Sequence, residues 1–168
     1  MDSDNIELDI QKIEELGKLR EKENLRFRIY LKGKDSNRID KIVHRLNLEI
    51  SGKIDCTKCG NCCKKISPSL NEKEIVRISE RINFSPEAVK EKYIEISDGE
   101  QFFKDRPCNF LHENKCSIYT DRPGDCREYP FLHKKFFISR LIGVIENYSI
   151  CPIVFNVFER LKTELRFK

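Results

Sequence analysis

The segment CTKCGNCC, residues Cys56–Cys63, places four cysteines close together in the chain. Gaps of two residues let successive thiolates point at one centre while the backbone turns around it, and Gly60 permits the positive φ that such a turn often needs. After an interval, four more cysteines follow: Cys108, Cys116, Cys126 and Cys151. The first 55 residues contain none. This distribution predicts that the later part of the chain is organised around cysteine-bound metal.

The cysteines are the candidate metal ligands. Eight thiols seldom persist as disulfides in a reducing cytosol, whereas thiolates at short spacing are typical of metal sites. Disulfides, or buried free thiols packed as small hydrophobic side chains, remain the alternatives. The predicted ligands are Cys56, Cys59, Cys62, Cys63, Cys108, Cys116, Cys126 and Cys151.

The spacing leaves the cofactor open between an iron-sulfur cluster and Zn²⁺. The C-x2-C-x2-C triplet from Cys56 to Cys62 fits iron-sulfur geometry, and Cys151-Pro152 offers the remote Cys-Pro that completes such a set. Zinc sites also use C-x2-C pairs. Adjacent side chains diverge on an extended backbone, so we expect Cys62 and Cys63 to serve different centres. The predicted groups are Cys56, Cys59, Cys62 and Cys151 for one centre, and Cys63, Cys108, Cys116 and Cys126 for the other.

Length and composition limit the class of protein. The chain has 168 residues, the size of one domain with or without an N-terminal extension. Charged residues make up 36% and hydrophobic residues 39%, so an apolar core would be thin. The most apolar stretch, 136–158, contains Arg140 and Glu146, which excludes a membrane-spanning helix. The acidic start MDSDNIELD is unlike a secretory leader, so we expect a cytoplasmic protein with no membrane partner.

Two elements are predicted before the first cysteine block. Residues 5–31 carry apolar positions at helical spacing and predict one amphipathic helix that ends near Gly33. Ser36 or Asn37 is the expected cap of a second helix. Residues 51–66 are too rich in Gly, Lys and Cys for a regular element and predict a loop.

A helical hairpin is predicted between the two cysteine blocks. Asn71 with Glu74 resembles a capping box, and Ser85-Pro86 starts a helix that continues to about Tyr93. Residues 100–119 are expected to be extended, with a tight turn in HENK, and 136–144 to form a further strand. A closing helix follows Pro152.

These elements define an α+β fold. We expect a small, irregular, metal-stapled domain with short strands and several helices over residues 51–168. A helical arm over residues 1–50 precedes it.

The motifs resemble those of the CxxCxxCC family, also called YkgJ-like cysteine-cluster proteins. The shared motifs are C-x2-C-G-x-C-C (56–63), P-C-x-F-L (107–111), C-S-I-Y (116–119), R-P-x-x-C-R-x-Y-P-F (122–131) and Cys151-Pro152. The resemblance covers more than half of the chain and all eight cysteines. It implies a zinc- or iron-chelating domain. Some larger relatives resemble flagellin lysine methylases, although we find no separate glycine-rich cofactor loop here.

For other residues, the sequence evidence for a role at the metal is weaker. His112 lies between two cysteines and could replace a thiolate. Arg122 and Arg127 flank Cys126, where guanidinium groups can tune a metal centre, and Arg127 is expected to offset part of the thiolate charge. Salt bridges at the surface are the alternative. We assign Lys64, Lys65, Lys134 and Lys135 to solvated surface, because acidic residues nearly match basic ones.

Three classes of function fit the sequence. The leading hypothesis is a metal-binding protein with an accessory, electron-carrying or metal-handling role. A methyltransferase-related or other metal-dependent enzyme is one alternative, and a metal-scaffolded module for protein or RNA interaction is the other. Eight cysteines suffice to close two sites, which argues mildly against an open catalytic position. Metal ions are the expected partners, with a possible protein partner at the N-terminal helices, and no nucleic-acid partner is expected.

Overall fold

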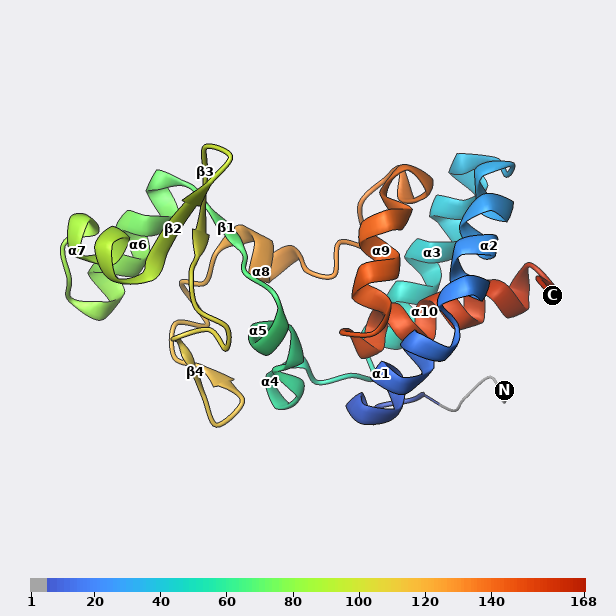
Figure 1. Cartoon of the computed structure of the whole chain (residues 1–168), viewed down its shortest axis with the longest axis horizontal. Coiled ribbons are helices and arrows are strands. Elements are labelled where there is room, and N and C mark those ends of the chain that lie inside the picture. The colour runs from blue at the N-terminus through green and yellow to red at the C-terminus, as the bar shows by residue number, and fades with distance from the viewer. Residues whose placement is uncertain (1–5) are drawn as a thin grey trace. The chain divides into compact units, whose positions relative to one another are not determined.

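The computed structural model describes residues 6–168, which are mainly helical with a few short antiparallel strands (Figure 1). The predicted α+β class is therefore confirmed. Contacts divide the chain into two compact units. The cysteine unit comprises Cys56–Tyr129, and the helical unit comprises the residues up to Asp55 together with Pro130–Lys168. The sequence predicted a boundary at residue 50, with residues 130–168 in the same domain as the cysteines.

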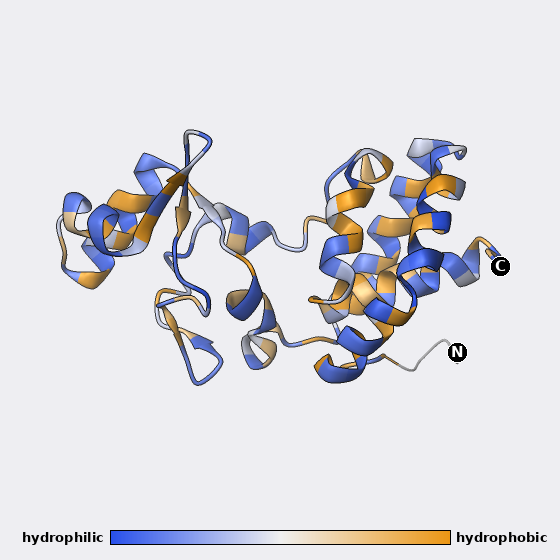
Figure 2. Cartoon of the chain, in the orientation of Figure 1, coloured by the Kyte–Doolittle hydropathy of each residue, from blue (hydrophilic) through white to orange (hydrophobic). Residues whose placement is uncertain are grey.

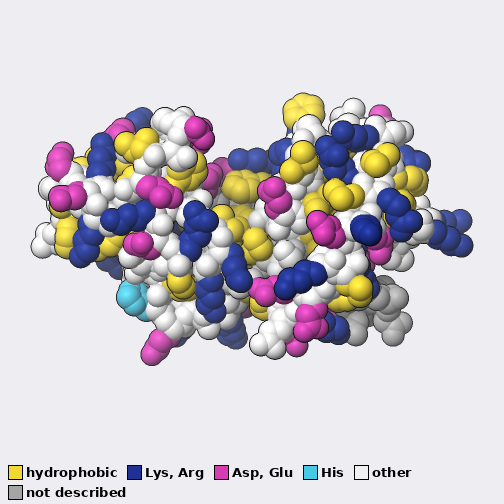
Figure 3. Space-filling view, in the orientation of Figure 1, with side chains coloured by type: hydrophobic (Ala, Val, Ile, Leu, Met, Phe, Trp, Pro, Cys, Tyr) yellow, Lys and Arg dark blue, Asp and Glu magenta, His cyan; other side chains and the backbone are white. Residues whose placement is uncertain are grey.

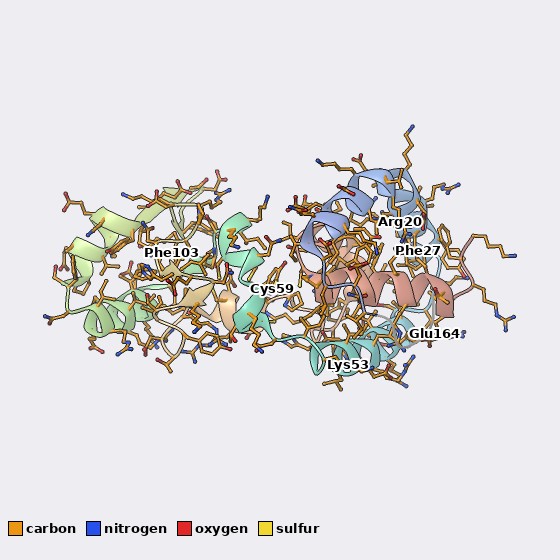
Figure 4. All side chains as sticks on the ribbon, turned by 90° about the horizontal axis from the view of Figure 1, so that it is seen from below. Arg20, Phe27, Lys53, Cys59, Phe103 and Glu164 are labelled. Atoms are coloured by element: carbon orange, nitrogen blue, oxygen red, sulfur yellow. The ribbon has the colours of Figure 1, made fainter. Side chains whose placement is uncertain are left out.

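The helical unit is built from α-helices and one 3₁₀ helix. Its elements are α1 (Ile10–Leu19), α2 (Glu21–Lys32), α3 (Ser36–Ser51), the 3₁₀ helix η1 (Phe137–Arg140), α9 (Leu141–Tyr148) and α10 (Pro152–Glu164). Helix α10 is almost wholly buried and packs against α3, α9 and α1. Figure 2 shows apolar residues along these helices, and Figure 4 labels Phe27 among them. The Phe27 and Phe158 rings meet edge to face at 5.1 Å, so this unit has an apolar core of its own.

The N-terminal helices differ from the prediction in their boundaries. The single helix expected over 5–31, whose first residue lies outside the described part, is broken at Arg20 into α1 and α2. Arg20 has φ −97° and ψ 10°, and its guanidinium pairs with Glu159 of α10. Helix α3 is capped by Asp35, whose carboxylate accepts the Arg38 amide at 2.7 Å, rather than by Ser36 or Asn37.

The strand predicted over 136–144 is wrong, because this segment is helical. Phe136 adopts a left-handed conformation, φ 61°, immediately before η1. The buried Asp40 carboxylate of α3 accepts the Phe136 and Phe137 amides at 2.8 and 2.9 Å and so supplies a cap. Leu141, Val144 and Tyr148 then form a buried stripe at helical spacing. A cap from a residue distant in the chain therefore makes 136–144 helical, although the local composition favours a strand.

The cysteine unit combines short helices with short strands. Its elements are α4 (Cys56–Cys59), α5 (Asn61–Lys65), β1 (Ser69–Leu70), α6 (Glu72–Ile82), α7 (Pro86–Tyr93), β2 (Ile94–Ser97), β3 (Glu100–Phe103), β4 (Leu111–His112), β5 (Lys115–Cys116) and α8 (Gly124–Glu128). The sheet order is β1-β3-β2, and β4 pairs with β5, all antiparallel. The loop expected over 51–66 instead contains the end of α3 and the short helices α4 and α5.

The helical hairpin of the cysteine unit agrees with its sequence signals. Asn71 and Glu74 form a reciprocal capping box at the start of α6, and Ser85 caps α7 with Pro86 at its first position. The hairpin supplies part of a small core, which consists of Leu70, Ile75, Ile78, Val89, Phe103, Phe110 and Ile118. Cys108 and Cys116 pack against this core.

The surface is polar, as the composition requires. On the face seen in Figure 3, Lys and Arg side chains are interspersed with Asp and Glu. Within residues 6–168, no helix combines the length and the apolar character needed to cross a bilayer.

Candidate metal centre

The turn between α4 and α5 brings the first cysteine block against the β4–β5 hairpin. Gly60 adopts the left-handed conformation, φ 58°, as its place in the CTKCGNCC segment predicted. A Cβ at this position would lie 3.2 Å from the carbonyl oxygen of Asn114, in the hairpin turn. Glu113 and Asn114 both have positive φ, so HENK forms the predicted tight turn. Glycine is thus required here both by the backbone angle and by the close approach.

Backbone pairing joins three of the cysteines. The Cys108 amide donates to the Cys63 carbonyl oxygen at 2.8 Å. The Leu111 amide donates to the Cys108 carbonyl oxygen at 2.9 Å, and Leu111 pairs with Cys116 across β4 and β5. Cys63, Cys108 and Cys116 therefore belong to one continuous hydrogen-bonded backbone arrangement.

Cys126 is presented by the short helix α8. Pro123 immediately precedes this helix, at its N-cap. The Gly124 amide donates to Glu74 Oε1 at 2.6 Å, and Asp125 Oδ2 accepts both the amide and the hydroxyl of Ser69. Helix α6 and strand β1 thus fix α8 at its first turn.

Four thiols influence one another's ionisation. A hydrogen bond with the Cys62 side chain is the main cause that lowers the pKa of Cys63 to about 7. Burial raises the pKa of Cys108 to about 11 and that of Cys126 to about 12, and the charge of Cys63 adds to both shifts. Burial and then Cys63 also raise the pKa of Cys116. Negative charges on these four groups would therefore repel one another unless a cation lay among them.

The contact between Cys62 and Cys63 changes the argument for two centres. Both residues lie on α5, so their backbone is helical and not extended as the prediction assumed. Their side chains are hydrogen-bonded to each other. The expectation that Cys62 and Cys63 diverge is therefore wrong, and their assignment to different centres stays a prediction.

The remaining predicted ligands lie on other elements. Cys56 is exposed and Cys59 half-buried, both on α4, where Figure 4 labels Cys59. Cys151 is buried at the N-terminus of α10, in the helical unit. His112 is exposed on β4. Among residues 6–168, no three His, Cys, Asp or Glu side chains already stand in an arrangement that could hold a metal ion.

The two arginines beside Cys126 have different roles. Arg127 donates to the carbonyl oxygens of Thr120 and Arg122 at 2.6 and 3.0 Å. The charges of Arg122 and Lys64 both favour the thiolate of Cys63, and the charge of Arg122 also favours that of Cys116. The charge-offsetting role expected for Arg127 stays a prediction.

Sequence reasoning missed two residues that position this loop. Glu74 was predicted only as a capping residue, yet it also accepts the Gly124 amide. Arg77, one turn along α6, donates to the carbonyl oxygens of Asp121 and Arg122. Neither interaction has a local signal, because the partners lie more than forty residues apart in the chain.

Comparison with known proteins identifies the family of the chain. A family model, CxxCxxCC, described as a putative zinc- or iron-chelating domain, matches residues 55–142. The chain belongs to the CxxCxxCC family. No curated protein matches the chain. No solved structure matches it either. Membership in this family supports metal binding, and zinc and iron are both consistent with it.

Proposed function

We propose that the cysteine unit is a thiolate-ligated metal domain in which Cys63, Cys108, Cys116 and Cys126 bind one zinc or iron ion. The observation that supports this proposal is the electrostatic influence of these thiols on one another, although they come from four different segments: α5, the segment before β4, β5 and α8. Four thiolate sulfurs are the donor set typical of structural zinc and of iron-sulfur proteins.

The electrostatics of the four thiols support a bound cation. All four are partly buried, and Cys108, Cys116 and Cys126 are each disfavoured as thiolates by burial and by the charge of Cys63. A divalent ion reverses this preference because it stabilises the deprotonated form of its ligands.

A site closed by four protein ligands has a limited chemistry. Catalytic metal centres keep one position for water or substrate, whereas structural and electron-carrying centres do not. We therefore assign a structural or electron-carrying role to this ion rather than a catalytic one. Cys56, Cys59 and Cys62 are proposed as ligands of a second centre.

Metal analysis of ligand variants tests the proposal. The full chain would be purified without oxygen, and its zinc, iron and acid-labile sulfide measured together with its visible absorption. Cys63→Ser and Cys116→Ser should lose the same metal equivalent, while Cys59→Ser should keep it. Retention of all metal in Cys116→Ser, or loss of one common equivalent in all three variants, would refute the grouping.

A further inference from the structure

Helix α2 presents two large apolar side chains to solvent. Leu25 is 47% exposed and Ile29 is 69% exposed. They lie four residues apart, so they are neighbours on one face of the helix. The other face of α2, which includes Phe27 and Leu31, is buried in the core of the helical unit. Helix α2 is therefore apolar on two sides, and its own core uses one of them.

The segment formed by η1 and α9 has a similar exposed side. Ile142 is 59% exposed, and the half-buried Ile138 and Ile145 precede and follow it at helical spacing. Both η1 and α9 contact α2 within the helical unit, and Figure 3 shows hydrophobic side chains over α2 and α9. We call this surface the α2–α9 face, and it consists of Leu25, Ile29, Phe136, Ile138, Ile142 and Ile145.

Phe136 is held in its exposed position by a residue of α3. Its φ of 61° is a left-handed conformation that is unfavourable for a bulky side chain. Asp40 accepts the amides of both Phe136 and Phe137 and so fixes this backbone. As a result Phe137 is buried, while Phe136 is 67% exposed. Backbone strain of this kind is concentrated at functional sites, which favours a binding role for the exposed ring.

The charges around the α2–α9 face are mainly positive. Within residues 21–32 and 135–146, exposed Lys and Arg side chains outnumber exposed Glu side chains. The carboxylate of Glu23 is paired with Lys162 of α10 at 2.8 Å, so part of the acidic charge of α2 is used inside the unit. Three of the cations lie three residues from Leu25 or Ile29 and are therefore their neighbours on the helix: Lys22, Arg26 and Lys32.

We propose that the α2–α9 face binds an acidic amphipathic helix of a partner protein. The two neighbouring elements offer two rows of apolar side chains, which one helix can contact along its apolar face. Carboxylates of the partner would pair with Lys22, Arg26 and Lys32. A second copy of the chain is disfavoured because two basic faces repel each other, and nucleic acid is disfavoured because Leu and Ile offer no ring on which bases stack. The inference goes beyond metal binding, since all of these residues lie in the helical unit.

Binding of a synthetic peptide to the full chain tests the proposal. The probe is a fluorescent peptide with leucines along one helical face and glutamates at the other positions, and its anisotropy is followed as protein is added. The unaltered protein should bind the peptide saturably. Ile29→Glu and Ile142→Glu should each weaken binding at least about tenfold, as changes at the centre of an interface do. Ile96→Glu is the matched control, because Ile96 is 75% exposed on β2 of the cysteine unit, and it should bind as the unaltered protein does.

Charge variants and other probes complete the test. The double variant Lys22→Glu, Arg26→Glu should bind the acidic peptide more weakly and with less salt dependence. A peptide with lysines in place of the glutamates should not bind. All variants should keep the circular dichroism of the unaltered protein, because each changed side chain is exposed.

Three outcomes would overturn the inference. The first is that the unaltered protein does not bind the acidic peptide, or that Ile29→Glu and Ile142→Glu bind it as tightly as the unaltered protein. The second is that the unaltered protein binds vesicles of anionic lipid but not the peptide, since the face would then serve a membrane surface. The third is a dimer of the unaltered protein that Ile29→Glu abolishes, since a second copy would then cover the face.

Discussion

Gly60 is the residue on which the turn of the CTKCGNCC segment depends. We expect Gly60→Ala to destabilise the cysteine unit by about 1–2 kcal/mol for the left-handed backbone, with a further loss from the contact with Asn114. Gly99→Ala is the matched control, because Gly99 also has positive φ, 81°, but nothing lies within 4 Å of its added Cβ. Urea denaturation of both variants measures the difference. Equal losses of unfolding free energy in Gly60→Ala and Gly99→Ala would show that the contact with Asn114 adds no cost.

Thiol ionisation should give the reduced, metal-free protein a stability maximum near pH 9. The pKa of Cys63, lowered to about 7, contributes stability that is present above the ordinary value of 9.0 and lost as the pH falls through 7. The raised values of Cys108 and Cys126, about 11 and 12, contribute stability that is present below 9.0 and lost as the pH rises through them. Urea midpoints of the cysteine unit should therefore be lower on both sides of pH 9. A urea midpoint that rose steadily up to pH 11 would contradict the predicted loss of stability above pH 9.

At the scale of elements, the N-terminus of α6 does more than start a helix. Asn71→Ala removes one half of the capping box and should destabilise the protein by about 1 kcal/mol. Glu74→Ala removes the other half and also the acceptor of the Gly124 amide, so it should in addition weaken metal retention at Cys126. Chelator competition on the two variants separates these effects. Equal metal retention in both would mean that the bond to Gly124 does not position α8.

At the scale of the whole molecule, the two units should respond differently to metal removal. Structural zinc can contribute about 10 kcal/mol or more, comparable with the whole stability of a domain. The cysteine unit contains the four proposed ligands, while Phe27, Phe158 and the buried helix α10 give the helical unit an independent core. Under reducing conditions with a chelator, amide exchange should accelerate in 56–129 and stay slow in α3 and α10. Uniform acceleration, or none, would refute this expectation.

Much of the fold was predictable because its signals are local. Asn71 with Glu74, Ser85 with Pro86, and the apolar spacing after Pro152 each predicted an element that the structure contains. Gly60 in the cysteine segment and the HENK turn belong to the same class, since each depends on the φ preference of one or two residues. The family was also readable from the sequence, because its motifs are short and contiguous.

The sequence by itself determined the α+β class, the candidate thiols and the family, and the tertiary structure decided which of these thiols act electrostatically on one another. The buried cap from Asp40 turned 136–144 into helix, and the packing of α10 on α3 and α9 joined 130–168 to the N-terminal helices. Cys63 meets Cys108 through a backbone hydrogen bond, and Arg77 of α6 binds the carbonyl oxygens of the loop before α8. Contacts between residues distant in the chain have no periodicity or spacing in the sequence, so only the folded molecule could show them.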